Sequence, residues 1–252
     1  MRHVFDTMGT TVSLTCEASA PLRAVERVFE VADRRFSLYR SDSEITRIAR
    51  GDLRLEGAGP EFIATYVEAI EWRSRTDGAF SPHRPDGVLD LNGIGKATAM
   101  REAGQLLDRA DGGVWTLVVG GDILTSAITQ PGEAIGITDP ADRSSLLCSF
   151  VMPGDRRAAA TSGSAERGDH IWLGGELGPA DFVQVSVLAG DIVTADVLAT
   201  AIVAAGRDGL DDICDRWPID VLTVDRAGLM RATPGFSDAI RAVDAVLGQP
   251  VG

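Results

Sequence analysis

TADVLATAIVAAG, residues 194–206, is an almost wholly apolar stretch whose residue types favour an α-helix. Thr194 is suited to the N-cap of that helix, and Gly206 is suited to end it in the left-handed conformation. Inside the helix only Asp196 and Thr200 are polar. Because they are four residues apart, both side chains project from one face, one turn apart. Such a helix is predicted to be buried, and a buried carboxylate is costly unless it is paired or holds a metal.

Two interpretations of Asp196 and Thr200 follow from this stretch alone. Their oxygen atoms suit a magnesium-type ion, which keeps its other positions for phosphate or water. Alternatively, Asp196 caps the helix N-terminus and Thr200 donates back to the carbonyl group of residue 196. The helix alone favours the capping interpretation, because aspartate is so common near helix starts. The rest of the chain reverses that preference.

The composition is that of an ordinary soluble globular protein, with 252 residues, 44% hydrophobic and 24% charged. The net charge of −13 argues against a surface made for nucleic acid or anionic lipid. An anionic cofactor would need local cations, backbone amides or a metal. The three cysteines form neither a metal-ligand spacing nor a disulfide framework. No apolar h-region opens the chain and no run reaches transmembrane length, so we expect a cytoplasmic protein without membrane insertion.

Hydrophobic spacing predicts one compact domain over residues 1–252, α/β or α+β in class, either undivided or with two lobes. No internal repeat and no linker divides the chain. Helices are predicted over residues 21–36, about 60–75, about 96–109 and 194–206, with a last helix that begins at Ser237 as its N-cap. Strands are predicted at residues 10–16, 115–122, 133–139, 146–152, 157–161 and 182–189, followed by a hairpin of 220–224 and 228–231.

Two polar or glycine-bearing stretches between these elements suit a ligand, although each is also typical of an ordinary connection. Residues 37–44 place an aromatic residue and an arginine in a polar turn, which suits stacking of a base and contact with a phosphate. Residues 89–96 run into a glycine-bearing turn, where backbone groups can approach a ligand and Lys96 reaches a helix start. This turn is neither a Walker A loop nor a dinucleotide fingerprint.

Further candidate stretches lie near predicted strands. Residues 7–10 (TMGT) open a strand and, taken alone, are best explained as a turn. Residues 76–82 (TDGAFSP) precede the glycine-bearing turn, and residues 119–122 (VGGD) end a strand with two glycines, another place for close approach. Residues 161–171 gather hydroxyl groups, Arg167 and His170 in a polar loop. A lone histidine beside an apolar residue is usually structural, so a structural and a functional interpretation both stay open.

Taken together and in this order, these stretches resemble the FAD:protein FMN transferases, the ApbE-type family first named as thiamine-biosynthesis lipoproteins. The resemblance runs from Met8 to about Gly206, through MGT, YRSDSEI, DGAFSP, LDLNGIGK, VGGD, IGITDP, ATSG with a following histidine, and the 194–206 helix. It implies an α+β fold, a two-lobed α/β unit with mixed sheets and flanking helices, and a flavin site between the lobes. It also implies an enzyme that binds FAD and Mg²⁺, transfers FMN to a threonine of a target flavoprotein and releases AMP.

The resemblance further assigns roles to individual residues. Asp196, Thr200 and the backbone carbonyl group of Gly93 would be the metal ligands. The FAD site would be lined by Met8, Tyr39, Ala79, Phe80, Ser81, Asp90 and Lys96. His170, which matches a histidine linked to catalysis in the family, would be catalytic together with Asp196 and would also contact FAD.

Three departures from the family pattern bear on these roles. Lys96 is followed by Ala97 and Thr98, where the family usually has glycine and an aromatic residue. The run that begins at His170 reads HIWLGGELG and lacks the Asp-Pro of the family. The lipoprotein signal common in the family is absent, which predicts modification of cytoplasmic flavoproteins or of the cytoplasmic side of others.

The implied chemistry is phosphoryl transfer, in which a threonine hydroxyl attacks the FMN-side phosphorus of FAD and AMP leaves. A metal on Asp196 and Thr200 would neutralise charge on the pyrophosphate, helped by Lys96 or Arg167. The base that takes the hydroxyl proton would be His170 or a neighbouring carboxylate. Two alternatives stay open, an FAD pyrophosphatase that uses water as the nucleophile and a non-catalytic FAD-binding protein.

Overall fold

The computed structural model describes residues 1–110, 113–127, 134–163 and 181–247, which form an α+β fold as predicted. The strands are β1 (Arg2–Thr7), β2 (Thr10–Thr15), β3 (Thr116–Val119), β4 (Asp122–Thr125), β5 (Ala134–Thr138), β6 (Leu146–Val151), β7 (Ala158–Gly163), β8 (Phe182–Ala189), β9 (Asp220–Asp225) and β10 (Met230–Ala232). The helices are α1 (Leu22–Phe36), α2 (Glu44–Ala49), the short 3₁₀ helix η1 (Leu55–Gly57), α3 (Pro60–Arg75), α4 (Asn92–Arg109), α6 (Ile192–Arg216) and α7 (Pro234–Leu247).

The described strands form one large sheet and one small sheet. The large sheet has eight strands in the order β1-β2-β3-β4-β7-β8-β9-β10, and the small one pairs β5 with β6. All of their ladders are antiparallel, so the expectation of mixed sheets is wrong for the described strands. The pairs β1–β2, β3–β4 and β9–β10 are joined by tight turns, which connect antiparallel strands and never parallel ones.

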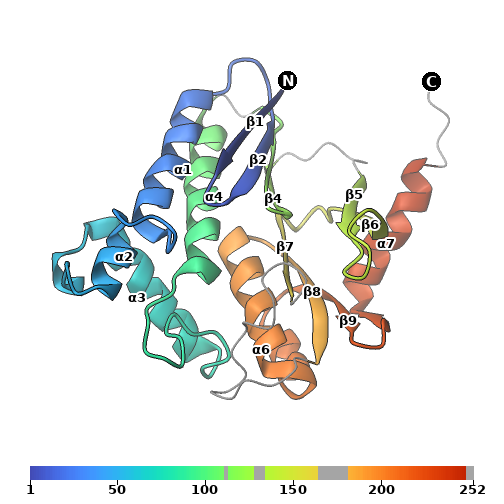
Figure 1. Cartoon of the computed structure of the whole chain (residues 1–252). Helices are drawn as coiled ribbons and strands as arrows, with labels where there is room; N and C mark the ends of the chain where they lie inside the picture. Colours follow the sequence, from blue (N-terminus) through green and yellow to red (C-terminus); the bar gives the residue numbers. More distant parts are fainter. Residues whose placement is uncertain (111–112, 128–133, 164–180, 248–252) are drawn as a thin grey trace.

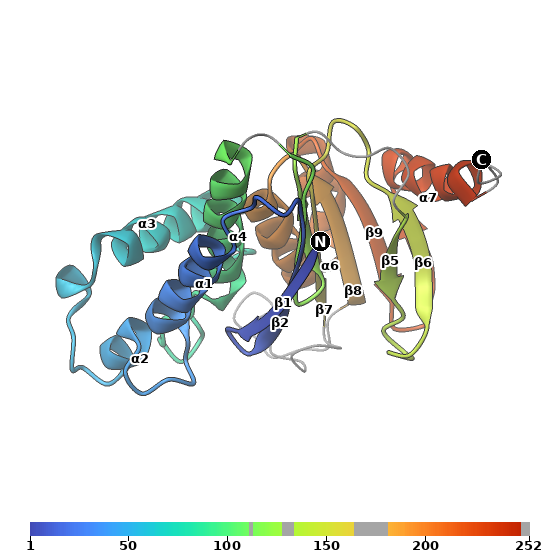
Figure 2. The ribbon, with the colours of Figure 1, turned by 90° about the horizontal axis from the view of Figure 1, so that it is seen from above.

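Helices cover one face of the large sheet, and the small sheet with α7 covers the other (Figure 1, Figure 2). α6 packs on β7 and β8, α4 packs on α6, and α1 packs on α4, whereas α7 packs on β6 and β9. Each face has its own apolar core, one of which includes Val187 and Leu198, the other Phe150, Leu188 and Phe236. Successive residues of a strand point to opposite faces, so β8 supplies Val187 to one core and Leu188 to the other.

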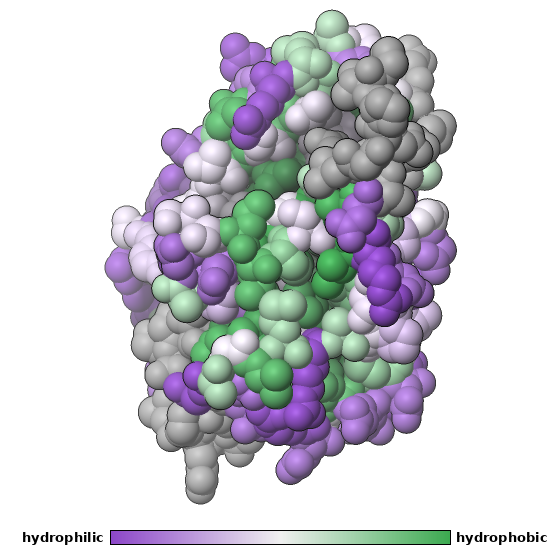
Figure 3. Space-filling view, turned by 90° about the vertical axis from the view of Figure 1, so that its right-hand side faces the viewer, coloured by the Kyte–Doolittle hydropathy of each residue, from purple (hydrophilic) through white to green (hydrophobic). Residues whose placement is uncertain are grey.

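The side of the molecule that carries α7, β5 and β6 shows a band of apolar side chains between polar borders (Figure 3). Leu146 of β6, with 63% of its surface exposed, is among the exposed large apolar residues of the described chain. None of the helices in the described ranges has the length and apolar character needed to cross a membrane. The prediction of a single domain, with or without two lobes, stays a prediction.

α6 begins before the predicted helix. Its N-cap is Asp191, whose carboxylate accepts hydrogen bonds from the backbone N–H and the hydroxyl group of Thr194 at 2.9 and 2.6 Å. The prediction of Thr194 as the N-cap is therefore wrong. The capping interpretation of Asp196 is wrong for the same reason, because Asp196 lies beyond the first turn.

α6 also continues past Gly206, where the sequence predicted its end. Gly206 does leave the helical conformation, with φ 65° and ψ −157°, and divides α6 into two helical segments. The second segment forms because the Asp181 carboxylate accepts the backbone N–H of Arg207 at 2.9 Å and so caps its first turn. This partner directly precedes β8 and lies outside the helix, so periodicity along α6 does not reveal it.

Other helix starts differ from prediction for local reasons. α4 begins at Asn92 instead of about residue 96, because the Asp90 carboxylate accepts the backbone N–H of Asn92 at 2.9 Å. α7 begins at Pro234 instead of Ser237, since proline is well suited to the first helical position. α2, which the sequence left as a polar turn, is capped by Ser43. β1, also not predicted, pairs with β2 across the turn at residues 8–9.

Candidate active site

Asp196 and Thr200 lie on α6 where the helix packs against β7 and β8. Asp196 is only 4% exposed, and Thr200, one turn further along, is half-buried. The hydroxyl oxygen of Thr200 lies 3.1 Å from the hydroxyl oxygen of Ser162 in β7. Thr200 therefore contacts the sheet through Ser162, and the buried carboxylate of Asp196 lies one turn before it on the same helix.

A buried ion pair joins α4 to the sheet close to these groups. Asp122, at the start of β4, is fully buried, and its carboxylate pairs with the ammonium group of Lys96, whose side chain is 12% exposed. The second carboxylate oxygen of Asp122 accepts the backbone N–H of Thr161 at 3.1 Å. Because Thr161 directly precedes Ser162 in β7, this hydrogen bond connects the ion pair to the strand that carries the Ser162 hydroxyl group. Separation of the two groups would leave uncompensated buried charges, which is strongly unfavourable. The ion pair therefore keeps the Lys96 ammonium group beside the sheet.

Gly93 lies in the first turn of α4, where the sequence predicted a turn before the helix. Its carbonyl oxygen has two lone pairs, so a helical hydrogen bond leaves one available for another ligand. A β-carbon on Gly93 would come within 3.0 Å of the Phe80 ring, so glycine is the residue that fits there without displacing that ring. The N-terminus of α4 also carries the positive end of the helix dipole, which favours an anion.

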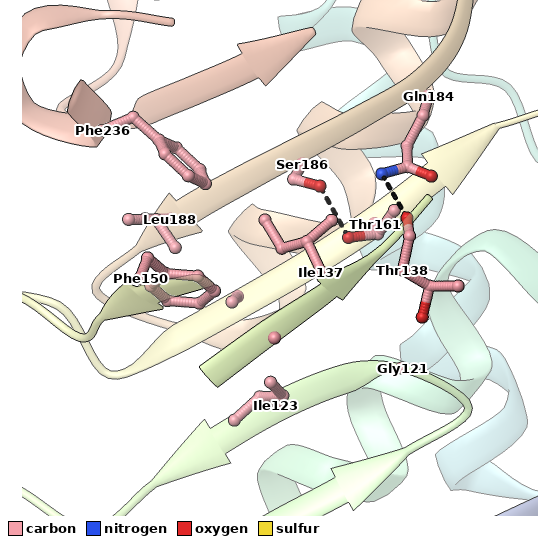
Figure 4. Close-up of a pocket in the computed structure, with 12 residues that line it drawn as sticks. Gly121, Ile123, Ile137, Thr138, Phe150, Thr161, Gln184, Ser186, Leu188 and Phe236 are labelled. Atoms are coloured by element: carbon pink, nitrogen blue, oxygen red, sulfur yellow. Dashed lines mark hydrogen bonds between the residues drawn. The ribbon is translucent and has the colours of Figure 1, made fainter. Parts of the chain in front are cut away.

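A pocket lies on the opposite face of the sheet, between β4, β7, β8, the small sheet and α7 (Figure 4). The hydroxyl oxygens of Thr161 and Ser186 lie 2.8 Å apart at one side of this pocket, and Gln184 donates to the carbonyl group of Thr138 at 3.3 Å. Phe150 is among the apolar residues opposite them. None of the described residues that line this pocket is charged.

Among the described residues predicted to line the FAD site, Lys96 lies within α4, and the others lie in connections between elements. Met8 lies in the turn between β1 and β2 with φ 49°, half-buried against the core on the helical face. Tyr39, after α1, is 96% exposed. Its neighbour Arg40 forms ion pairs with Asp33 at 3.3 Å and Asp42 at 2.9 Å. Tyr39 therefore has no role in the packing of the core, and its role at FAD stays a prediction.

Four further residues predicted to line the FAD site lie between α3 and α4. Ala79 is half-buried, Phe80 is 3% exposed within the core, and Ser81 is exposed. Asp90 uses its carboxylate to cap α4. Arg216, at the end of α6, donates to the Asp77 carboxylate at 2.5 Å and so ties the turn before Ala79 to α6. No contact in the described chain tests the FAD-binding roles of these residues.

His170 and Arg167 lie outside the described residues, so their roles also stay predictions. Within the described ranges no three His, Cys, Asp or Glu side chains come together to hold a metal. The predicted magnesium site needs no such group, since it has one carboxylate, from Asp196, with hydroxyl and carbonyl oxygens. Mg²⁺ is commonly bound through one or two carboxylates and completes its shell with water and substrate phosphates. The donor set therefore fits a magnesium ion that binds together with an anionic ligand.

A family model described as the ApbE family matches residues 8–84 and 81–223. The chain belongs to the ApbE family. The match includes the turn at Met8, the start of α4, the strand that carries Ser162 and the helix that carries Asp196, so the predicted family is confirmed. A comparison with curated proteins finds no match.

Solved ApbE structures have the same fold as this chain. The flavin transferase ApbE from Vibrio cholerae is 21% identical, with a TM-score of 0.76 over 95% of this chain and 98% of that one. The ApbE protein from Thermotoga maritima is 20% identical, with a TM-score of 0.79 over 96% of this chain and 99% of that one. The Pseudomonas stutzeri flavinyl transferase ApbE is 18% identical, with a TM-score of 0.74 over 95% and 97%. The likeness covers nearly the whole of each chain and confirms the α+β fold.

Two residues at this site, Asp122 and Ser162, have no assigned role in the sequence-based prediction. Both lie in stretches that stood out in the sequence, VGGD and the hydroxyl-bearing run at residues 161–163. Their partners, Lys96 and Thr200, are far away in the sequence, so only the paired strands and packed helices bring them together. In the sequence, each of the two is only a polar residue beside a glycine near the end of a predicted strand, a pattern too common to assign a role.

Proposed function

We propose that this ApbE-family protein transfers FMN from FAD to a threonine of a target flavoprotein, with Mg²⁺ as the metal, and releases AMP. The observation that carries the proposal is the buried carboxylate of Asp196, one turn from Thr200, on a helix packed against the sheet. This arrangement offers hard oxygen ligands to a cation that must neutralise a pyrophosphate. The family supports the same activity, since its solved members include flavin transferases from Vibrio cholerae and Pseudomonas stutzeri.

Asp196, Thr200 and the carbonyl group of Gly93 would hold the cation. When bound, the ion supplies positive charge that stabilises the pyrophosphate and the departing AMP. Lys96 would assist at the pyrophosphate as a hydrogen-bond donor, and its buried ion pair with Asp122 holds it beside the sheet. The first turn of α4 adds the positive end of its dipole. Met8, Tyr39, residues 79–81 and Asp90 would line the rest of the FAD site.

In the transfer, the acceptor threonine oxygen forms a bond to the phosphorus on the FMN side. The bond from that phosphorus to the bridging oxygen breaks, and AMP leaves with that oxygen. The hydroxyl proton passes to a base, for which the family resemblance favours His170, with a nearby carboxylate as the alternative.

His170→Ala separates a catalytic role of this histidine from a structural one. Loss of a general base typically costs on the order of 10²- to 10⁴-fold in rate, so we expect FAD binding and melting temperature near wild type with most AMP release lost. The measurements are turnover and a melting curve on the same preparation. A variant that melts much earlier, yet turns over normally per folded molecule, would make His170 structural.

The activity is tested by incubating the purified protein with FAD and Mg²⁺, with and without a candidate acceptor flavoprotein, and measuring AMP and the mass of the acceptor. An acceptor that gains one FMN while AMP appears supports the transferase. AMP and free FMN without any acceptor would indicate the pyrophosphatase alternative. FAD binding with no AMP in either condition would indicate the non-catalytic alternative.

A further inference from the structure

Ser162 lies on β7 with its hydroxyl group toward α6, whereas its neighbour Thr161 faces the pocket on the other side of the sheet (Figure 4). The two hydroxyl oxygens of Ser162 and Thr200 are 3.1 Å apart, and both side chains are half-buried. The Ser162 backbone is well fixed, because β7 pairs with β8 and Thr161 donates its backbone N–H to Asp122. Ser162 is therefore a hydroxyl group held at a defined place beside a proposed metal ligand.

The proton of the Thr200 hydroxyl group decides what its oxygen can bind. A hydroxyl group has one donor and two acceptor lone pairs. An oxygen atom that binds a cation uses a lone pair, so its proton has to be donated elsewhere. A helical threonine commonly donates to the carbonyl group one turn back, but the hydrogen bond described for Thr200 is with Ser162. Ser162 thus offers a proton acceptor that comes from the sheet and not from the helix itself.

We propose that Ser162 is a positioning residue for the divalent cation. Ser162 accepts the proton of Thr200, which leaves a lone pair of Thr200 for the cation held with Asp196. This inference rests on the metal ligands of the proposed function. Hydrogen-bond partners behind metal ligands typically change metal affinity by about 10- to 100-fold. A neutral hydroxyl partner belongs near the lower end of that range.

The test measures binding of Mn²⁺ to the purified full-length chain without FAD, from the electron paramagnetic resonance signal of the free ion. Mn²⁺ prefers the same oxygen ligands as Mg²⁺, and no turnover is needed for the readout. We expect Ser162→Ala to raise the Mn²⁺ dissociation constant about tenfold while its melting temperature stays near wild type. Ser162→Thr keeps the hydroxyl group on a strand that tolerates a β-branched residue, so we expect affinity near wild type.

Thr125→Val is the matched control. Thr125 is 6% exposed in β4, and its hydroxyl group donates to the carbonyl group of Arg157 at 3.2 Å, just before β7 begins. The variant loses one hydroxyl hydrogen bond, between β4 and the residue that directly precedes β7. That bond does not involve Ser162. We expect its Mn²⁺ affinity to match wild type.

Each other outcome contradicts the inference in a recognisable way. Equal Mn²⁺ affinity in Ser162→Ala and wild type would remove Ser162 from the metal site and leave the proposed function intact. Equal losses in Ser162→Thr or Thr125→Val would show general loosening of the sheet. A wild-type protein that binds no Mn²⁺ would overturn both the metal ligands and the role of Ser162. FMN transfer measured in EDTA would then show whether the transfer itself survives.

Discussion

Asp196 combines a carboxylate with almost complete burial, 4% exposed, and so gives the most direct test of the metal proposal. Asp196→Asn preserves the size of the side chain and removes its charge. We expect the variant to fold, with a circular dichroism spectrum near wild type, and to lose Mg²⁺-dependent FAD turnover, because a neutral amide is a poorer ligand for a hard cation. Full activity, or wild-type turnover that is unchanged in EDTA, would show that Asp196 is not a metal ligand.

Tyr39 is a residue whose exposure, 96%, points away from a role in the core. If its ring stacks on FAD, Tyr39→Ala removes an interaction worth about 1–3 kcal/mol, by analogy with bases stacked on aromatic side chains. We therefore expect the FAD dissociation constant to rise about 5- to 150-fold with little change in melting temperature. Quenching of flavin fluorescence measures the affinity.

Leu229→Ala is a suitable control for Tyr39, since Leu229 is 51% exposed in the turn between β9 and β10. Its truncation removes an exposed apolar side chain that has no predicted role at FAD. Unchanged affinity in Tyr39→Ala, or an equal loss in Leu229→Ala, would remove Tyr39 from the flavin site.

At the scale of an element, α6 connects several parts of the proposed site. Its first segment carries Asp196 and Thr200 against the sheet. Its last residue, Arg216, donates to Asp77 at 2.5 Å and to Asp212 at 3.0 Å, and its guanidinium carbon lies 4.7 Å from the centre of the Trp217 ring. One helix therefore supports both the proposed metal ligands and the turn that leads to residues 79–81.

Gly206 sets the break between the two segments of α6, and its substitution tests that break. Gly206→Ala forces an alanine to φ 65°, and its β-carbon would come within 2.5 Å of the Asp181 carboxylate that caps Arg207. Strain of this kind costs on the order of 1–3 kcal/mol, so we expect a lower melting temperature in thermal unfolding.

Gly228→Ala supplies the comparison for Gly206. Gly228 has φ 77°, but nothing lies within 4 Å of an added β-carbon, so it reports the backbone strain alone. We expect Gly206→Ala to lose more stability than Gly228→Ala. Equal losses in the two variants would mean that the close approach of the added β-carbon to Asp181 costs no stability beyond the backbone strain.

For the whole molecule, ligand binding should appear as added thermal stability. A ligand at 100 times its dissociation constant stabilises the folded state by about 2.7 kcal/mol. In a chain of this length each kcal/mol raises the melting temperature by about 2–4 °C. We expect FAD to raise the melting temperature, and Mg²⁺ to add to that rise in wild type but not in Asp196→Asn. Absence of any shift with FAD in wild type would contradict FAD as the substrate.

The sequence by itself determined the α+β class, the family, and the pairing of Asp196 with Thr200 on one helical face. These depend on local properties, namely the 3.6-residue period of α6 and short motifs in a fixed order. The helix predicted over residues 60–75 has those bounds in the structure, and the one predicted over 21–36 begins only one residue later. Proline near both starts and continuous apolar spacing explain why neither needs a distant partner.

Only the tertiary structure decided which groups meet at the site. The partners Lys96 and Asp122, and Ser162 and Thr200, come from separate elements and meet because the sheet is antiparallel and α4 and α6 pack on it. The extension of α6 beyond Gly206 likewise depends on Asp181, which directly precedes β8. Hydrogen bonds and ion pairs of this kind act over a few ångströms of space, whereas spacing along the chain reports only neighbours on the same helix or strand. The order of the strands in the sheet decides which residues that are distant in the sequence become neighbours in space.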